Sequence, residues 1–600
     1  MLGALAGCGG SDGGDGGFSS GGCAGNCGVT TPTALTVAEV ERIIRQAVQE
    51  AQARGAAATI AVADRSGNVL AVFRMNGAAA TFTVTSGRGV TGGLEGVSTV
   101  ASEFGAISKA ITGAYLSSEG NAFSTRTANQ IVLENFNPGE LGSPGGPLFG
   151  VQFSSLACSD IVLSAASGSA GPKGSPLGLA ADPGGLPLYK NGTVVGGIGV
   201  IADGIYGLDL DIFNIDTSID ELVAVAGGSG FDAPAARRAS TISVDGRTLR
   251  YVDSEFLESN PATAPPFGAL PGALVAVPGY TVAAAVTAGV PYGTAPSGIR
   301  RDVTPAFAGL NAFVVDDGGG VNRYPPIAGT DGLLTQAEVT RVLAEAIRVA
   351  NRARGQIRRP LGSPAQVSIS IVDTAGTVLG LIRTPDAPVF GIDVSVQKAR
   401  SALLFSHPNA AAELNALAGI GTYVTRMQAL IPGALTDGTA YSNRTVGNLA
   451  RPFLPDGING SPPGPLSRTF ANWSPFSDGL QLDLVLNGIV GSIGAPTPPC
   501  TGLARAPNGI QIFPGSVPIF RGNTLVGAIG ISGDGIDQDD MIAFLGLANA
   551  GTALGTGIAN APAARRADQI GGVPGGQLRY VNCPVAPFLD TNATNVCNGI

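Results

Sequence analysis

A long stretch of this chain occurs twice, in the same order and without a gap. "AFSTRTANQIVLENFNPGELGSPGGPL" begins at Ala122, and "AYSNRTVGNLARPFLPDGINGSPPGPL" begins at Ala440. Ser, Arg, Thr, Pro and Gly keep fixed positions in both stretches, so neither is a low-complexity repeat. The period of about 300 residues is far longer than the roughly 20 to 50 residues of a solenoid unit. The sequence therefore predicts a duplicated domain.

Further paired segments follow the same order in each half of the chain. The pairs are "LTVAEVERIIRQAVQEA" from Leu35 and "LTQAEVTRVLAEAIRVA" from Leu334, "IAVADRSGNVLAVFRM" from Ile60 and "ISIVDTAGTVLGLIRT" from Ile369, and "VVGGIGV" from Val194 and "LVGAIGI" from Leu525. We place a tether at residues 1–30, the first domain at 31–258, a Pro/Gly/Ala-rich connector at 259–332 and the second domain at 333–600. We expect each domain to fold by itself.

Each copy shows the same series of local patterns. It opens with an amphipathic helix, whose capping box is Thr36 with Glu39 in the first copy and Thr335 with Glu338 in the second. A β-rich hairpin, a helix with a central Lys, a second hairpin and an acidic helix start follow. This order predicts an α+β fold, an antiparallel sheet flanked by helices, duplicated in tandem.

Composition limits the class of partner. Charged residues make up 13% of the chain, and the net charge is −9 without any cluster of Lys and Arg. A protein that binds a phosphate backbone needs such a basic surface. We therefore expect a small-molecule ligand and no nucleic acid.

The first residues suggest a lipid anchor. Leu5, Ala6, Gly7 and Cys8 have the form of a bacterial lipobox, and a Gly/Ser-rich tether follows. Cys8 would carry the lipid, and the true signal peptide would begin upstream of Met1, because no basic residue precedes Cys8. We expect a protein of the cell envelope, lipid-anchored or secreted into the periplasm. The alternative is a tail of small residues with one incidental Cys.

The other six cysteines would then lie in an oxidising compartment, which favours disulfides. Six cysteines allow 15 connectivities, and Cys583 with Cys597 would close a short C-terminal loop. Zinc is disfavoured because paired C-x2-C units are missing.

The shared motifs resemble the GlcG/HbpS-like family of heme-binding proteins. The resemblance rests on the "LTxAEV" helix, the "VVDxxGxVLxxxR" hairpin, the "KA" helix, the "P(L/I)xxxGxxVGxIGV" hairpin and the "xxQDxxIA" helix at Gln538 and Asp539. It implies a compact α+β domain, often oligomeric, that binds a tetrapyrrole or a related small ligand. We expect binding of heme or such a ligand without catalysis. Two departures stand out: an insertion at 77–96 in the first copy, and extra residues after His407 in the second.

Five residues are candidates for binding heme. Arg126 and Arg444 lie in Ser/Thr-rich segments, and a guanidinium binds a carboxylate such as a heme propionate bidentately. Lys109 and Lys398 could do the same, and His407 could ligate iron. The alternatives are an Arg that bonds loop carbonyls, Lys side chains that reach solvent, and a histidine at a helix end.

Other chemistry finds less support in the sequence. A single histidine disfavours Ser/His or Cys/His catalysis, so we name no catalytic residue. The acidic runs 209–221 and 534–540 could bind calcium, although neither fits an EF-hand loop and acids at a helix start are explained by capping. A cofactor-free structural or interaction module of the cell envelope remains the alternative function.

Overall fold

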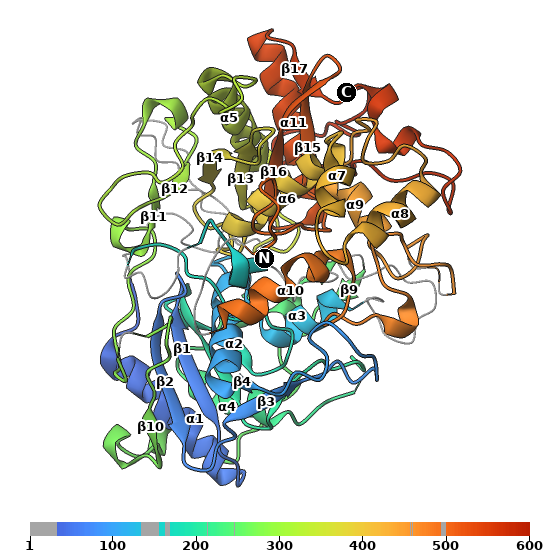
Figure 1. The fold of residues 1–600 in the computed structure, drawn as a ribbon. Helices are drawn as coiled ribbons and strands as arrows, with labels where there is room; N and C mark the ends of the chain where they lie inside the picture. The colour runs from blue at the N-terminus through green and yellow to red at the C-terminus, as the bar shows by residue number, and fades with distance from the viewer. Residues whose placement is uncertain are drawn as a thin grey trace, which may run out of the picture.

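The computed structural model describes residues 33–133, 155–162 and 169–600, apart from 213, 245, 282, 457, 459 and 494–499. The two copies form two lobes, blue to green and yellow to red in Figure 1, each with a sheet that carries helices. This arrangement confirms the predicted α+β fold and its tandem duplication.

The first copy is built around a five-stranded antiparallel sheet with the order β10-β2-β1-β6-β5. Its main elements are α1 (Val37–Ala53), β1 (Thr59–Asp64), β2 (Val69–Met75), α2 (Ser102–Leu116), α3 (Thr125–Val132), β5 (Gly185–Lys190), β6 (Thr193–Ile201) and α4 (Ile219–Gly228). The capping box at Thr36 and Glu39 is formed as predicted.

The second copy repeats this plan in a seven-stranded sheet with the order β11-β12-β14-β13-β16-β15-β17. Its main elements are α5 (Gln336–Arg352), β13 (Val367–Val372), β14 (Val378–Arg383), α6 (Gly391–Ser406), α9 (Asn443–Leu449), β15 (Ser516–Arg521), β16 (Thr524–Gly533), α11 (Ile536–Leu554) and β17 (Ile558–Asn560). Its capping box, Thr335 with Glu338, is also formed.

Strand register relates the two copies residue by residue. Gly185 of β5 pairs with Gly199 of β6, and Ser516 of β15 pairs with Gly530 of β16. A Cβ on Gly199 would collide with the carbonyl oxygen of Ala106 on α2, so only glycine allows this helix to lie so close to the sheet. Gly530 has the same relation to α6. The equivalent helices therefore lie at equivalent places on their sheets.

The connector adds strands to both sheets. β10 (Gly272–Leu274) extends the first sheet beside β2, whereas β11 (Ile299–Arg301) and β12 (Phe313–Val315) extend the second sheet beside β14. Residues 259–332 are thus packed on both copies. None of the described helices has the length and apolar character needed to cross a bilayer.

Each copy carries its own insertions. In the first, β3 (Thr81–Val84), β4 (Val100–Ala101) and β7 (Ile205–Tyr206) form a small separate sheet. In the second, α7 (Ala410–Asn415) and α8 (Gly421–Leu430) are added, and α10 (Leu480–Ser492) follows further along the chain. α10 packs against the short 3-10 helix Ser155–Cys158 of the first copy.

The two copies share a hydrophobic core. One continuous cluster of buried apolar side chains includes Ile107 and Ile111 of α2 together with Val394 and Leu403 of α6. A disulfide between Cys158 and Cys500 also joins the copies. The expected domain boundaries remain a prediction, but the burial of apolar surface depends on both copies at once.

An apolar pocket between the two copies

A pocket lies where the two copies meet. The cavity itself is small, about 50 Å³, and the space not filled by atoms reaches about 640 Å³ only when the open mouth is included. The first copy supplies apolar walls from Leu116, Phe123, Ile131, Val244 and Leu249. The second supplies Ile357, Phe390, Val394, Phe513 and Ile536, together with a polar end formed by Gln356, Lys398, Ser532, Gly533, Asp534, Gly535 and Asp539.

Lys398 is the cation at the polar end. Its Nζ donates to the carbonyl oxygen of Ile531 at 2.8 Å and to Asp539 Oδ2 at 2.9 Å. An ammonium group has three N–H donors, so one donor of Lys398 has no partner among the residues that the structure describes. Its side chain is only 3% exposed, and the remaining N–H therefore needs a partner inside the protein or in a ligand.

Two buried carboxylates line the polar end of the pocket. Asp539 accepts from Lys398 through Oδ2, and Asp534 accepts from Arg358 and from the amide of Gln366 through Oδ2. The Oδ1 atom of each carboxylate is buried and receives no hydrogen bond from the described residues. Burial raises the pKa of both groups to about 6, against the opposing effect of Lys398 and Arg358.

The equivalent lysine of the first copy is fully paired. Lys109 Nζ donates to the carbonyl oxygens of Pro183 and Val200 at 2.9 and 2.8 Å and to Asp220 Oδ2 at 2.6 Å. Asp182 Oδ2 forms a second ion pair with it at 2.6 Å. Burial alone would lower the pKa of Lys109, but Asp182 and Asp220 outweigh it and raise the pKa.

Both copies contain segments that match a known protein family. Residues 35–87, 342–447 and 480–548 match the family described as "Haem degrading protein HbpS-like". Both copies carry HbpS-like sequence. The matched residues include α1 and the first hairpin of the first copy, and α6 and the first part of α11 of the second.

Several solved structures are similar to parts of this chain. Klebsiella pneumoniae ORFY, a DUF336 protein, is 20% identical over 35% of this chain and 97% of its own, with a TM-score of 0.21. The PduOC–heme complex is 17% identical over 36% and 91%, with a TM-score of 0.17. A double mutant of Streptomyces reticuli HbpS is 21% identical over 34% and 91%, with a TM-score of 0.18. No curated protein matches the chain.

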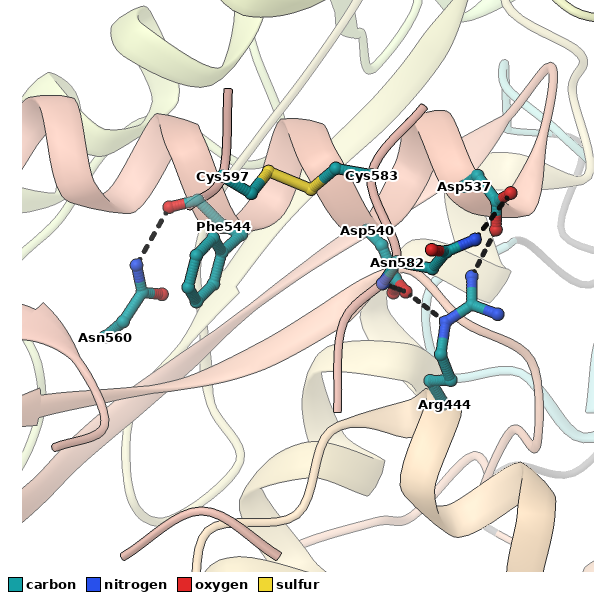
Figure 2. The surroundings of a disulfide bond; sticks show 8 residues. All are labelled: Arg444, Asp537, Asp540, Phe544, Asn560, Asn582, Cys583 and Cys597. Atoms are coloured by element: carbon teal, nitrogen blue, oxygen red, sulfur yellow. Dashed lines mark hydrogen bonds and ion pairs between the residues drawn. A yellow bond between two sulfur atoms is a disulfide. The ribbon is translucent and has the colours of Figure 1, made fainter. Parts of the chain in front are cut away.

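Arg126 and Arg444 are not free to receive a ligand carboxylate, contrary to our expectation. Arg126 is fully buried, and its Nε and Nη2 donate to Glu221 at 2.9 and 3.2 Å. Arg444 pairs with Asp537 and Asp540 in the same way, beside Asn582 and the Cys583–Cys597 disulfide (Figure 2). Both HbpS-like copies thus use this arginine to fasten the start of the acidic helix.

The carboxylate cluster of the first acidic run is neutralised by arginine. Oxygen atoms of Asp209, Asp216 and Asp253 lie within 4.8 Å of one another. Nη1 of Arg126 lies 2.8, 3.2 and 2.9 Å from these three groups, and Arg250 also pairs with Asp209. A guanidinium therefore occupies the centre where a calcium ion would have to bind, and we do not pursue calcium.

His407 lies away from the pocket. It ends α6 and lines an open hollow with Asp437 and Arg565. Its Nδ1 accepts a hydrogen bond from the amide of Asn409 at 3.1 Å, so a neutral ring holds its proton on Nε2. That tautomer donates a hydrogen bond and does not offer Nε2 to iron. His407 thus lies at the end of a helix, as the alternative interpretation of this residue expected.

The lysine predictions have different outcomes. Lys109 and Lys398 are both buried, so the alternative in which they reach solvent is wrong. Only Lys398 lines the pocket. Sequence reasoning missed the aromatic walls and the role of Asp539. One sequence signal could have distinguished the two lysines. An ungapped alignment of the second hairpins places Asp182 of the first copy opposite Phe513 of the second.

Proposed function

We propose that this HbpS-like chain binds heme or a related tetrapyrrole in the pocket between its copies. The observation that carries the proposal is an apolar pocket that ends in a buried ammonium with one unused donor. A tetrapyrrole has a flat apolar ring and carboxylate side groups, which match the apolar walls and the ammonium group in chemical kind. The cavity of about 50 Å³ must widen at the contact between the copies to admit the ring. The description of the matched family as heme-degrading supports the choice of ligand.

The described residues of the pocket can contact the ring and pair with its carboxylates, but they offer no side chain that commonly ligates heme iron. The rings of Phe123, Phe390 and Phe513 line the walls, and Lys398 is placed to donate to a propionate. No His, Cys, Tyr or Met is found among the described residues that line the pocket. We therefore propose that apolar burial and one ion pair hold the ligand, with no strong side-chain ligand to the iron.

A titration tests this proposal. Hemin and metal-free protoporphyrin IX should both bind, because the pocket recognises the ring and its acid groups. Protoporphyrin dimethyl ester should bind at least about tenfold more weakly, since it loses a charge-assisted hydrogen bond of roughly 1.5–3 kcal/mol. His407→Ala should leave the Soret shift unchanged. If no probe binds, the cofactor-free envelope module becomes the better account.

Binding without turnover is part of the proposal. The Soret band of bound hemin should persist when a reductant and oxygen are added. A steady loss of the band, with release of an open-chain product, would show catalysis and contradict this part.

We also propose that the chain works outside the cytoplasm, held by a lipid on Cys8. The disulfides Cys158–Cys500 and Cys583–Cys597 support an oxidising compartment. The second is the pair predicted from the sequence. Cys8 lies outside the described residues. Mass spectrometry of the N-terminal peptide from native membranes tests the anchor, and an unmodified cysteine in cytosolic protein would reject it.

A further inference from the structure

The two lysine sites started from one ancestral plan. Lys109 and Lys398 occupy the same position on α2 and α6, and each donates to the equivalent strand carbonyl, Val200 or Ile531. Each also pairs with the equivalent acidic residue, Asp220 or Asp539. Apart from these shared contacts, the surroundings of the two ammonium groups differ.

One substitution separates the sites electrostatically. Asp182 and Phe513 both stand three residues before the equivalent paired residues Gly185 and Ser516. In the first copy Asp182 supplies the second carboxylate on Lys109, whereas in the second copy Phe513 gives the pocket an apolar wall. Lys109 thus faces two carboxylates and Lys398 only one. A ligand anion would be repelled at the first site and accepted at the second.

In the first copy, side chains fill the region beside Lys109 that corresponds to the pocket beside Lys398. Val394 and Ser532 line the pocket, and their equivalents are Gly105 and Ile201. The ring of Phe82 from the inserted strand β3 packs over both, since a Cβ on Gly105 would lie 2.9 Å from Phe82 and 3.1 Å from Ile201.

A second ring completes this closure. Phe82 is 1% exposed and stacks against Tyr206 at 5.3 Å between ring centroids. The insertion at 77–96, which distinguishes the first copy, therefore places Phe82 where a ligand would have to enter, and Tyr206 of β7 packs against it.

From these differences we infer that the chain binds one ligand, at Lys398 only, and that the first copy has become the wall of that site. The inference rests on the proposed function and adds a ligand class: an apolar molecule with an exposed carboxylate. The carboxylate accepts the unused N–H of Lys398. Leu116, Phe123 and Leu249 of the first copy cover its apolar part.

Exchange of the distinguishing residue provides the test. Phe513→Asp gives the second copy the residue of the first, so that Lys398 gains a second protein carboxylate and the pocket gains a charge. We expect at least a tenfold rise in the dissociation constant for hemin. Asp182→Phe is the matched change in the sealed copy and should leave affinity and stoichiometry unchanged. Circular dichroism and thermal melts establish that each variant is folded.

A second pair of variants covers the case in which Phe513→Asp does not fold. Leu249→Trp adds volume to the wall supplied by the first copy and should weaken binding by a similar factor. Leu578→Trp changes the equivalent residue of the second copy, which is not among the pocket-lining residues, and should have no effect.

Stoichiometry and a second probe separate the inference from the proposed function. Hemin and the fluorescent fatty acid cis-parinaric acid should each bind once per chain and compete. Two hemins per chain, or equal loss of affinity in Asp182→Phe and Phe513→Asp, would overturn the single-site inference but leave heme binding intact. Binding of parinaric acid alone, lost in Phe513→Asp, would reject heme and retain the site. If neither probe binds, both claims fail.

Discussion

Arg65 of the first copy and Asp386 of the second form a buried ion pair, with 2.7 Å between Nη2 and Oδ1. Asp386 also accepts from Arg358 at 2.6 Å and from the amide of Glu119 at 3.0 Å. Arg358 in turn pairs with Asp534 at the polar end of the pocket. The polar end of the pocket and the contact between the copies therefore belong to one connected network.

Breaking this ion pair should destabilise the whole chain. Asp386→Ala leaves two buried guanidinium groups without their shared carboxylate, and such a loss typically costs about 3–5 kcal/mol. Urea unfolding should show a lower midpoint in a single transition. Adding Arg65→Met should recover part of the loss, because the two residues interact directly. Fully additive losses would contradict the coupling.

Separation of the copies should abolish cooperative folding. Residues 31–258 and 259–600 share one buried apolar cluster, so each piece alone exposes surface that the whole chain buries. Contrary to the expectation from the sequence that each domain folds by itself, we now expect neither piece to melt cooperatively alone, and we expect mixing or co-expression to restore a transition. Cooperative melting of either piece alone would mean that its own core is enough to stabilise the fold without the other copy.

Stability should rise as the pH falls from 8 to about 5. Burial raises the pKa of Asp393 to about 7 and of Asp478 to about 8. The folded state then binds more protons than the unfolded state between their ordinary pKa and these values, so that deprotonation favours unfolding. Asp386 acts in the opposite sense: burial opposes its ionisation, but Arg358 and Arg65 lower its pKa to about 2. Its stabilising contribution should disappear only as the pH falls from about 4 to 2.

Asp478→Asn isolates one part of this pH dependence. The Oδ2 atom of Asp478 is buried without a hydrogen-bond partner, whereas Oδ1 accepts from Leu482 at 3.1 Å. A neutral amide avoids the buried charge and keeps the acceptor. Urea midpoints at pH 8 should be higher than in the wild type and nearly equal at pH 5. A lower midpoint at both values would count against the raised pKa.

The two disulfides should contribute unequally. Cys158–Cys500 spans 342 residues, whereas Cys583–Cys597 spans 14. In the loop-entropy model a short loop of that kind is worth about 3 kcal/mol, and a much longer one about 5. Replacing the long-range pair with serines should therefore lower the melting temperature more than replacing the C-terminal pair. The reverse order would show that the long loop is already restrained by other contacts.

Sequence reasoning reached the parts of the fold that local pattern controls. Helical periodicity and the capping box at Thr335 and Glu338 fix α5, and turn residues between β-rich runs fix the hairpins. The short Cys583–Cys597 loop was accessible for the same reason. The disulfide from Cys158 to Cys500 was not, because its partners are brought together only by packing between the copies.

The functional residues were harder to rank, since a side-chain type does not reveal its partners. Arg126 fits a ligand carboxylate in principle, but the acidic run of its own copy supplies Asp209 and Glu221 to pair with it. Lys109 and Lys398 look equivalent along the chain. They differ only once the fold places Asp182 on one of them and Phe513 near the other.

A crystal structure of the full chain grown with hemin tests the central claim most directly. The account predicts one macrocycle per chain in the pocket between Phe123 and Phe513, with a propionate oxygen within hydrogen-bond distance of Lys398 Nζ. It also predicts no ligand density at Lys109. A macrocycle in the hollow beside His407, with Nε2 on the iron, or a second macrocycle at Lys109, would contradict the account.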